Sequence, residues 1–229
     1  MKNKDLNEII TSSLGLDTKN SEPVLTEAVV LTVKEYTHNT EALSNKTKNA
    51  HYELYENYIK EFNNISAQLD AIDMGEANPN NSKFRCLKQN EVHNMNAAYL
   101  HELYFANSSD MNSEILMESL AYIKLQRDFG TFDNWQRDFV ACGLATRGGW
   151  AMTAYNVFLK RYQNYFIDDH SVNVPVGIYP VIVLDMWEHA SRDYLNHKKE
   201  YIYRQMRELN WDVIEERIKK SEAISAVLR

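Results

Sequence analysis

Apolar side chains recur every three or four positions along two long segments in the first half of the chain. Residues 43–69 form the first segment, and Ser44 is placed to cap the start of a helix there. A loop rich in asparagine, with Gly75 and Pro79, follows at 73–85, and a second helix is expected over 87–107. Two such helices predict an antiparallel hairpin. The apolar face of the first helix comprises Leu54, Tyr55, Tyr58, Ile59, Phe62 and Ile65.

The pattern changes in the second half of the chain. Helices are expected over 113–127 and 134–142, and again over 193–229 with a break near 209–211. Between them, three segments rich in Val, Ile and Tyr predict strands at 150–156, 161–168 and 179–186. Strands grouped between helices indicate an α+β fold rather than alternating strands and helices.

We therefore expect an N-terminal antiparallel helical hairpin, followed by a C-terminal domain with a three-stranded antiparallel sheet and helices. The predicted domain organisation is an N-terminal extension at 1–27, a helical hairpin domain at 28–110 and an α/β C-terminal domain at 111–229.

Composition and charge narrow the function classes. The chain has 229 residues, of which 44% are hydrophobic, and a net charge of −7, which argues against a general nucleic-acid binder. Its longest apolar run, 180–184, is too short to cross a bilayer, so no membrane partner is expected. Two cysteines are too few for a disulfide framework and fit a reducing compartment. These features predict a cytoplasmic protein, the alternative being part of a larger assembly.

Four residues in aromatic surroundings suggest a metal site. Asp185 and His189 lie four positions apart, just after the most apolar strand, and their oxygen and nitrogen atoms suit Mn, Fe or Zn. Taken alone, this pair also fits a capping aspartate and a helical histidine. His101 and His51 each lie in a helix among aromatic residues, where a single buried histidine is more often a hydrogen-bonded core residue. Three such histidines with one aspartate favour a metal ion.

The motifs around these residues resemble those of the iron/manganese superoxide dismutases. The run VLDMWEHA at 183–190 resembles the signature of that family. Five further motifs occur in the family's order between residues 28 and 217: LSNKT at 43–47, LHELYF at 100–105, DFGTF at 128–132, GGWA at 148–151 and NW at 210–211.

The resemblance implies an enzyme that converts superoxide to dioxygen and hydrogen peroxide. Each subunit would hold one Fe or Mn, and the sequence does not separate the two metals. The implied metal ligands are His51, His101, Asp185 and His189. Trp150 and Trp187 would line the pocket and keep it dry, although both also fit ordinary core tryptophans.

Three further roles follow from the same resemblance. Tyr58 resembles the tyrosine beside the solvent channel. His170, fifteen residues before Asp185, resembles the residue that hydrogen-bonds metal-bound solvent, and Ala97 occupies the alternative position for that donor. Glu188 resembles the glutamate that reaches the partner subunit's ligand histidine, which implies a homodimer or a higher oligomer.

The first helix departs from the family pattern. His51 and Tyr58 are seven residues apart, where the family has eight. Seven residues of a regular helix turn about 700°, so both side chains return to within about 20° of one face. If the family helix carries a bulge that is lost here, both residues face the metal. Otherwise His51 points elsewhere and the first ligand is missing.

A second departure follows the signature. Ser191 takes the place of a tyrosine that lines the channel, and Arg192 would either attract superoxide or pair with Asp193 or Glu188. Such changes also fit a non-catalytic structural or assembly protein, for example a virus-particle component, in which the metal only stabilises the fold. A metal-dependent enzyme of another type is a third reading.

Overall fold

The computed structural model describes residues 29–37, 39–109 and 113–227. The expected N-terminal extension, 1–27, lies outside these residues. The boundary expected at 110–111 also falls outside them, so the division into domains stays a prediction.

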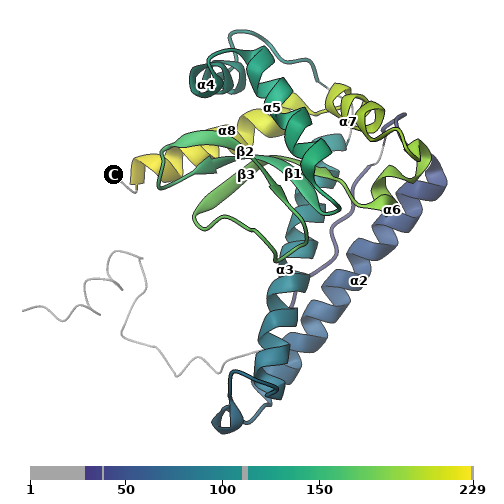
Figure 1. The fold of residues 1–229 in the computed structure, drawn as a ribbon, viewed down its shortest axis with the longest axis vertical. Helices are drawn as coiled ribbons and strands as arrows, with labels where there is room; N and C mark the ends of the chain where they lie inside the picture. The colour runs from purple at the N-terminus through teal and green to yellow at the C-terminus, as the bar shows by residue number, and fades with distance from the viewer. Residues whose placement is uncertain (1–28, 38, 110–112, 228–229) are drawn as a thin grey trace, which may run out of the picture.

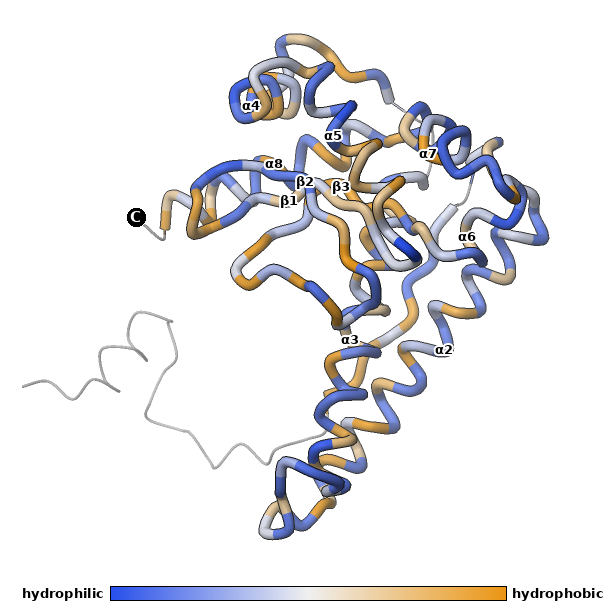
Figure 2. The backbone as a smooth tube through the Cα atoms, in the orientation of Figure 1, coloured by the Kyte–Doolittle hydropathy of each residue, from blue (hydrophilic) through white to orange (hydrophobic). Residues whose placement is uncertain are grey.

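A long helical hairpin projects from the rest of the molecule, as predicted (Figure 1). Its two helices are α2 (Asn45–Asp70) and α3 (Lys83–Ser108), which pack along each other. Ser44 caps α2 by accepting a hydrogen bond from the backbone N–H of Thr47, and Ser82 caps α3 in the same way. Figure 2 shows apolar and polar residues alternating turn by turn along α2. The connecting loop contains a short 3₁₀ helix, η2 (Met74–Glu76).

Two shorter helices, α4 (Leu120–Phe129) and α5 (Phe132–Ala145), follow the hairpin. The prediction of a helix over 113–127 was wrong about its start. Ser119 caps α4, and the Glu215 carboxylate accepts hydrogen bonds from the first two backbone N–H groups of the helix. Ser113 lies outside α4 and forms a β-bridge with Asn210. The helix therefore begins after Ser119, where the Glu215 carboxylate accepts hydrogen bonds from its first backbone N–H groups.

The predicted three-stranded antiparallel sheet is confirmed. Its strands are β1 (Trp150–Asn156), β2 (Arg161–Ile167) and β3 (Ile178–Asp185), in the order β2-β1-β3. Every residue of the central strand β1 is buried, because α5 covers β1 and β2 while α3 and α8 pack against β3. Trp150 at the start of β1 lies opposite Asp185 at the end of β3. This register places a large aromatic ring beside the end of the most apolar strand.

The chain after β3 is helical and returns to the hairpin and the sheet. It forms α6 (Glu188–Ser191), the 3₁₀ helix η3 (Arg192–Tyr194), α7 (Lys198–Arg207) and α8 (Trp211–Val227). The break expected near 209–211 is confirmed, because α7 ends at Arg207 and α8 begins at Trp211. Among the described helices, none combines the length and the apolar character needed to cross a membrane.

Candidate metal centre

The structure brings the four expected ligand residues together from four separate elements. His51 comes from α2, His101 from α3, Asp185 from the end of β3, and His189 from α6. One nitrogen or carboxylate oxygen from each residue lies within 4.8 Å of the others. His51, His101 and Asp185 are buried, and His189 is partly exposed. The site therefore lies where the hairpin, the sheet and the C-terminal helices meet.

Two hydrogen bonds hold Asp185 in place. The backbone N–H of Trp187 donates to Asp185 Oδ1 over 2.8 Å. The Tyr201 hydroxyl donates to the backbone oxygen of Asp185 over 2.6 Å. With Oδ1 engaged, Oδ2 is the atom that faces the histidines, at 3.0 Å from His51 Nε2 and 3.2 Å from His189 Nε2.

The contact between His101 and Asp185 indicates a cation. His101 Nδ1 lies 2.7 Å from the carbonyl oxygen of Ala97, which can only accept, so the ring proton is on Nδ1. His101 Nε2 then carries a lone pair, and it lies 3.7 Å from Asp185 Oδ2. This nitrogen is buried and has no hydrogen-bond partner among the described residues. His101 Nε2 and Asp185 Oδ2 are thus two buried acceptors that face each other with no proton between them. A metal ion between the two atoms would satisfy both.

Burial and charge set the protonation of this cluster. Burial lowers the pKa of His101 well below its usual value, and the neighbouring His51 lowers it further. Burial also lowers the pKa of His51, against the opposing effect of Asp185. For Asp185, burial acts to raise the pKa, but hydrogen bonds from His189 and His51 outweigh it and hold the pKa well below the usual range. Neutral imidazoles with one ionised carboxylate are the forms that bind first-row transition metals.

The helix that carries His51 is regular. α2 runs as an uninterrupted α-helix through both His51 and Tyr58. His51 lies in the cluster, and the Tyr58 hydroxyl lies 3.1 Å from His170 Nε2 beside it. The seven-residue spacing thus brings both side chains to the same pocket without a bulge.

His170 is oriented by hydrogen bonds to both of its ring nitrogens. The indole N–H of Trp150, which can only donate, lies 3.0 Å from His170 Nδ1. The proton of the neutral ring is therefore on Nε2, which donates to the Tyr58 hydroxyl. Burial, with a contribution from His93, lowers the pKa of His170 to about 4, so the ring is neutral at pH 7. The expected hydrogen bond from His170 to metal-bound solvent stays a prediction.

Two tryptophans line this pocket. The Trp150 ring is fully buried and meets the His101 ring edge-on, with the ring centres 5.0 Å apart. The Trp187 ring stacks on that of His189 at 6.3 Å. Gly148 also packs against Trp187, since an added Cβ at this position would come within 3.2 Å of the indole. Both tryptophans therefore contact histidines of the cluster, beyond filling core space.

The residues expected at a subunit boundary lie on α6 and η3, next to His189. Glu188 is exposed at the start of α6. The Ser191 hydroxyl donates to the backbone oxygen of Trp187. Asp193 accepts two hydrogen bonds from Ser44, from its backbone N–H and from its hydroxyl, which ties η3 to the start of α2.

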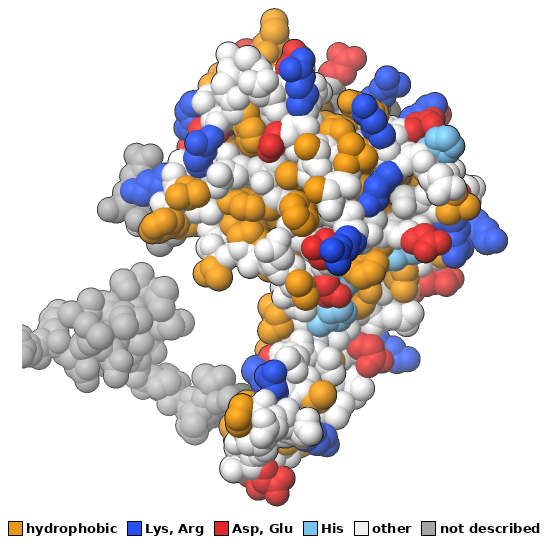
Figure 3. Space-filling view, in the orientation of Figure 1, with side chains coloured by type: hydrophobic (Ala, Val, Ile, Leu, Met, Phe, Trp, Pro, Cys, Tyr) orange, Lys and Arg blue, Asp and Glu red, His pale blue; other side chains and the backbone are white. Residues whose placement is uncertain are grey.

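One pair near the site was missed by sequence reasoning. His93 on α3 lies 3.1 Å from Asp169, the residue before His170, through its Nδ1 and the carboxylate Oδ1. His93 and His101 are eight residues apart, about 2.2 helical turns, so this spacing gave no signal for the pair. Figure 3 shows histidine side chains at the surface where the hairpin joins the rest of the molecule.

Comparison with known proteins identifies the class to which this centre belongs. The family model described as iron/manganese superoxide dismutases, C-terminal domain, matches residues 118–217. A protein of Aquifex aeolicus named superoxide dismutase (Fe) is 34% identical over 188 residues, which cover 80% of this chain and 87% of that protein.

Two further relatives carry different metals in their names. Superoxide dismutase (Fe) of Cupriavidus metallidurans is 33% identical over 74% of this chain and 85% of that protein. Superoxide dismutase (Mn) of Haloarcula marismortui is 32% identical over 58% of this chain and 64% of that protein. All three relatives are thus named as superoxide dismutases, two with Fe and one with Mn. The chain belongs to the iron/manganese superoxide dismutase family.

Proposed function

We propose that this chain is a superoxide dismutase that uses one iron or manganese ion per subunit. The observation that carries the proposal is the buried pair of acceptors, His101 Nε2 and Asp185 Oδ2, left without a proton between them. His51, His101, Asp185 and His189 would hold the ion. The bound metal supplies the alternating one-electron oxidation and reduction of superoxide.

The surrounding residues have separate tasks in this reaction. Two superoxide anions and two protons give one dioxygen and one hydrogen peroxide, so the protein must deliver protons to a dry site. Because His170 donates to Tyr58, the Tyr58 hydroxyl keeps its own proton free to donate into the pocket. Burial, followed by the charges of Asp185 and Asp169, raises the pKa of Tyr58, which keeps that proton in place. Trp150 and Trp187 exclude water around the ligands.

The oligomer and the compartment are part of the same proposal. We propose that two copies pair through the surface around α6, where Glu188 would reach His189 of the second copy. The exposed carboxylate of Glu188 and the partly exposed ring of His189 are available for such a contact. Cys86 and Cys142 are both free thiols, which is consistent with a reducing compartment such as the cytoplasm.

Metal analysis and a superoxide removal assay on the purified full chain test the function. We expect about one Fe or Mn per subunit, catalytic removal of superoxide, and a solution mass of at least two subunits. A chain that binds the metal but does not remove superoxide would favour the structural or assembly role over the enzyme. A chain that binds neither metal would contradict the proposed centre itself.

Tyr58→Phe should lower kcat about tenfold. This is the lower end of the loss in activity usually caused by removing a residue that supports a metal site. The substitution removes the hydroxyl that receives the His170 hydrogen bond and keeps the ring, so the metal content should not change. Stopped-flow assays normalised to bound metal measure the effect. Tyr203→Phe, at an exposed tyrosine on α7, is the matched control and should leave kcat unchanged. Equal kcat values for both variants would remove Tyr58 from the proton path.

A further inference from the structure

His93 and Asp169 are in hydrogen-bond contact at the edge of the pocket, and no role assigned so far explains this contact. His93 Nδ1 lies 3.1 Å from Asp169 Oδ1, and both side chains are about one-third exposed. The His93 ring meets the His170 ring edge-on, with ring centres 4.8 Å apart, and lies 6.2 Å from the Tyr58 ring. The pair therefore stands between solvent and the hydrogen-bonded Tyr58 and His170.

The backbone that carries His170 depends on α3 for its position. His170 follows β2 in a segment without regular secondary structure. Asn96 of α3 donates to the backbone oxygen of His170 over 2.7 Å, and His93, almost one turn earlier, holds Asp169. The same Asp169 oxygen accepts from the backbone N–H of Ser171 over 3.3 Å, which fixes the turn around His170. Asp169 and His170 are thus both held by hydrogen bonds to α3.

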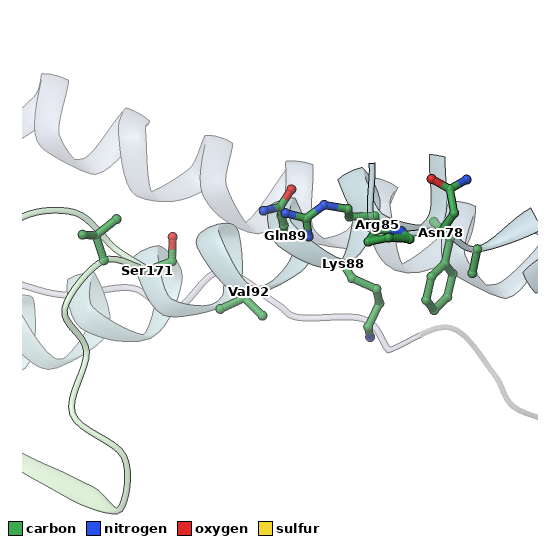
Figure 4. Close-up of a pocket in the computed structure, with 10 residues that line it drawn as sticks. Asn78, Arg85, Lys88, Gln89, Val92 and Ser171 are labelled. Atoms are coloured by element: carbon green, nitrogen blue, oxygen red, sulfur yellow. The ribbon is translucent and has the colours of Figure 1, made fainter. Parts of the chain in front are cut away.

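A surface groove lies next to this junction. It has a volume of about 770 Å³ and is lined on α3 by residues up to Val92 and on the other side by Ser171 (Figure 4). Val92 precedes His93, and Ser171 follows His170 by one position. Because this side is open to solvent, core packing alone does not hold the segment against α3.

The His170 side chain cannot correct a displaced backbone. Its Nδ1 is engaged by Trp150 and its Nε2 by Tyr58, at 3.0 and 3.1 Å. A shift of the backbone by a few tenths of an ångström would lengthen one of these bonds past the usual range. We propose that His93, through its hydrogen bond to Asp169, is a positioning residue that keeps His170 in its donor contact with Tyr58. This inference rests on the proposed function, since it concerns proton delivery in the same reaction.

Two substitutions at His93 separate its hydrogen bond from its ring. His93→Phe keeps an aromatic ring against His170 and loses the donor to Asp169, whereas His93→Gln loses the ring and keeps an N–H that can reach Asp169. We expect His93→Phe to lower kcat about tenfold and His93→Gln to lower it less than about threefold, since partners of this kind usually contribute tenfold or more. Because the metal ligands are untouched, kcat/KM per bound metal should change by less than about twofold.

Asp169→Asn tests the other half of the pair. It should lower kcat as His93→Phe does, and the double variant should be no slower than either single variant, because the residues act through one contact. Hydrogen exchange measured by mass spectrometry should be faster over 168–173 in His93→Phe, a readout independent of activity. His197→Phe, at an exposed histidine before α7, is the matched control and should change neither quantity.

The outcomes distinguish this inference from the proposed function. If the wild type does not remove superoxide, the proposed function fails first. If the wild type is active and His93→Phe keeps full kcat, or if His93→Gln loses more than His93→Phe, positioning through Asp169 is wrong. Equal losses of kcat and kcat/KM, together with lost metal, would show a general structural defect and would also overturn the inference.

Discussion

Replacing Asp185 with alanine should leave the purified chain without bound iron or manganese and without measurable superoxide removal. Asp185 supplies the one carboxylate of the cluster, and its Oδ2 lies within 3.7 Å of a nitrogen of each histidine. Without it, three neutral imidazoles lack the negative charge that offsets desolvation of the cation. Element analysis after extensive dialysis, with the superoxide assay on the same sample, measures both effects.

Two further variants sharpen this test. Asp185→Asn keeps the shape of the side chain and removes its charge, so it should also lose most of the metal. Asp212→Ala, at an exposed aspartate on α8, is the control and should keep full metal content. If both Asp185→Ala and His101→Ala retained full metal, the ion would have to lie outside this cluster and the assignment of the centre would be wrong.

Much of the fold follows from local signals in the sequence. The cap at Ser44 and the strand composition at 150–156 act over a few residues, and the structure confirms both elements at nearly the expected bounds. The start of α4 was misplaced because Ser113 and Ser119 are both possible local caps, and Glu215, more than ninety positions away in sequence, satisfies the first N–H groups after Ser119. A cap supplied from that distance leaves no trace in a local pattern.

The same distinction holds for the candidate site. Each of the four expected ligands lies in a sequence motif that predicts the helix or strand end carrying it, as β3 ends at Asp185. The four side chains meet when these elements pack together. The sequence left open whether His51 and Tyr58 face the same pocket, and the regular helix of the structure brings them together. The pairing of His93 with Asp169 could not be predicted, because the two residues lie on different elements and meet only once the segment after β2 packs on α3.

Gly149 connects the fold to the site at the point where β1 begins. Its φ is +98°, a conformation that residues with a side chain rarely adopt. A Cβ at this position would lie 2.1 Å from the backbone oxygen of Ile167 and 2.9 Å from the carbonyl carbon of Asp168. Both neighbours are backbone atoms at the end of β2, so they cannot move aside without disturbing the sheet. The Gly149 oxygen also accepts from the backbone N–H of Met186, next to Asp185.

Gly149→Ala should therefore lower the free energy of unfolding by about 4 kcal/mol, in the range reserved for severe local clashes. Gly177→Ala is the matched control, since Gly177 also has a positive φ, +71°, but nothing lies within 4 Å of an added Cβ. Gly177→Ala should lower the free energy of unfolding by about 1 kcal/mol, which is the strain of the left-handed conformation alone. Urea unfolding of the metal-free forms measures both values.

Because the Gly149 oxygen accepts a hydrogen bond from the strand end that carries Asp185, Gly149→Ala should also retain less metal than Gly177→Ala. Equal stabilities for the two variants would mean that the backbone at Gly149 relaxes freely and does not brace the site.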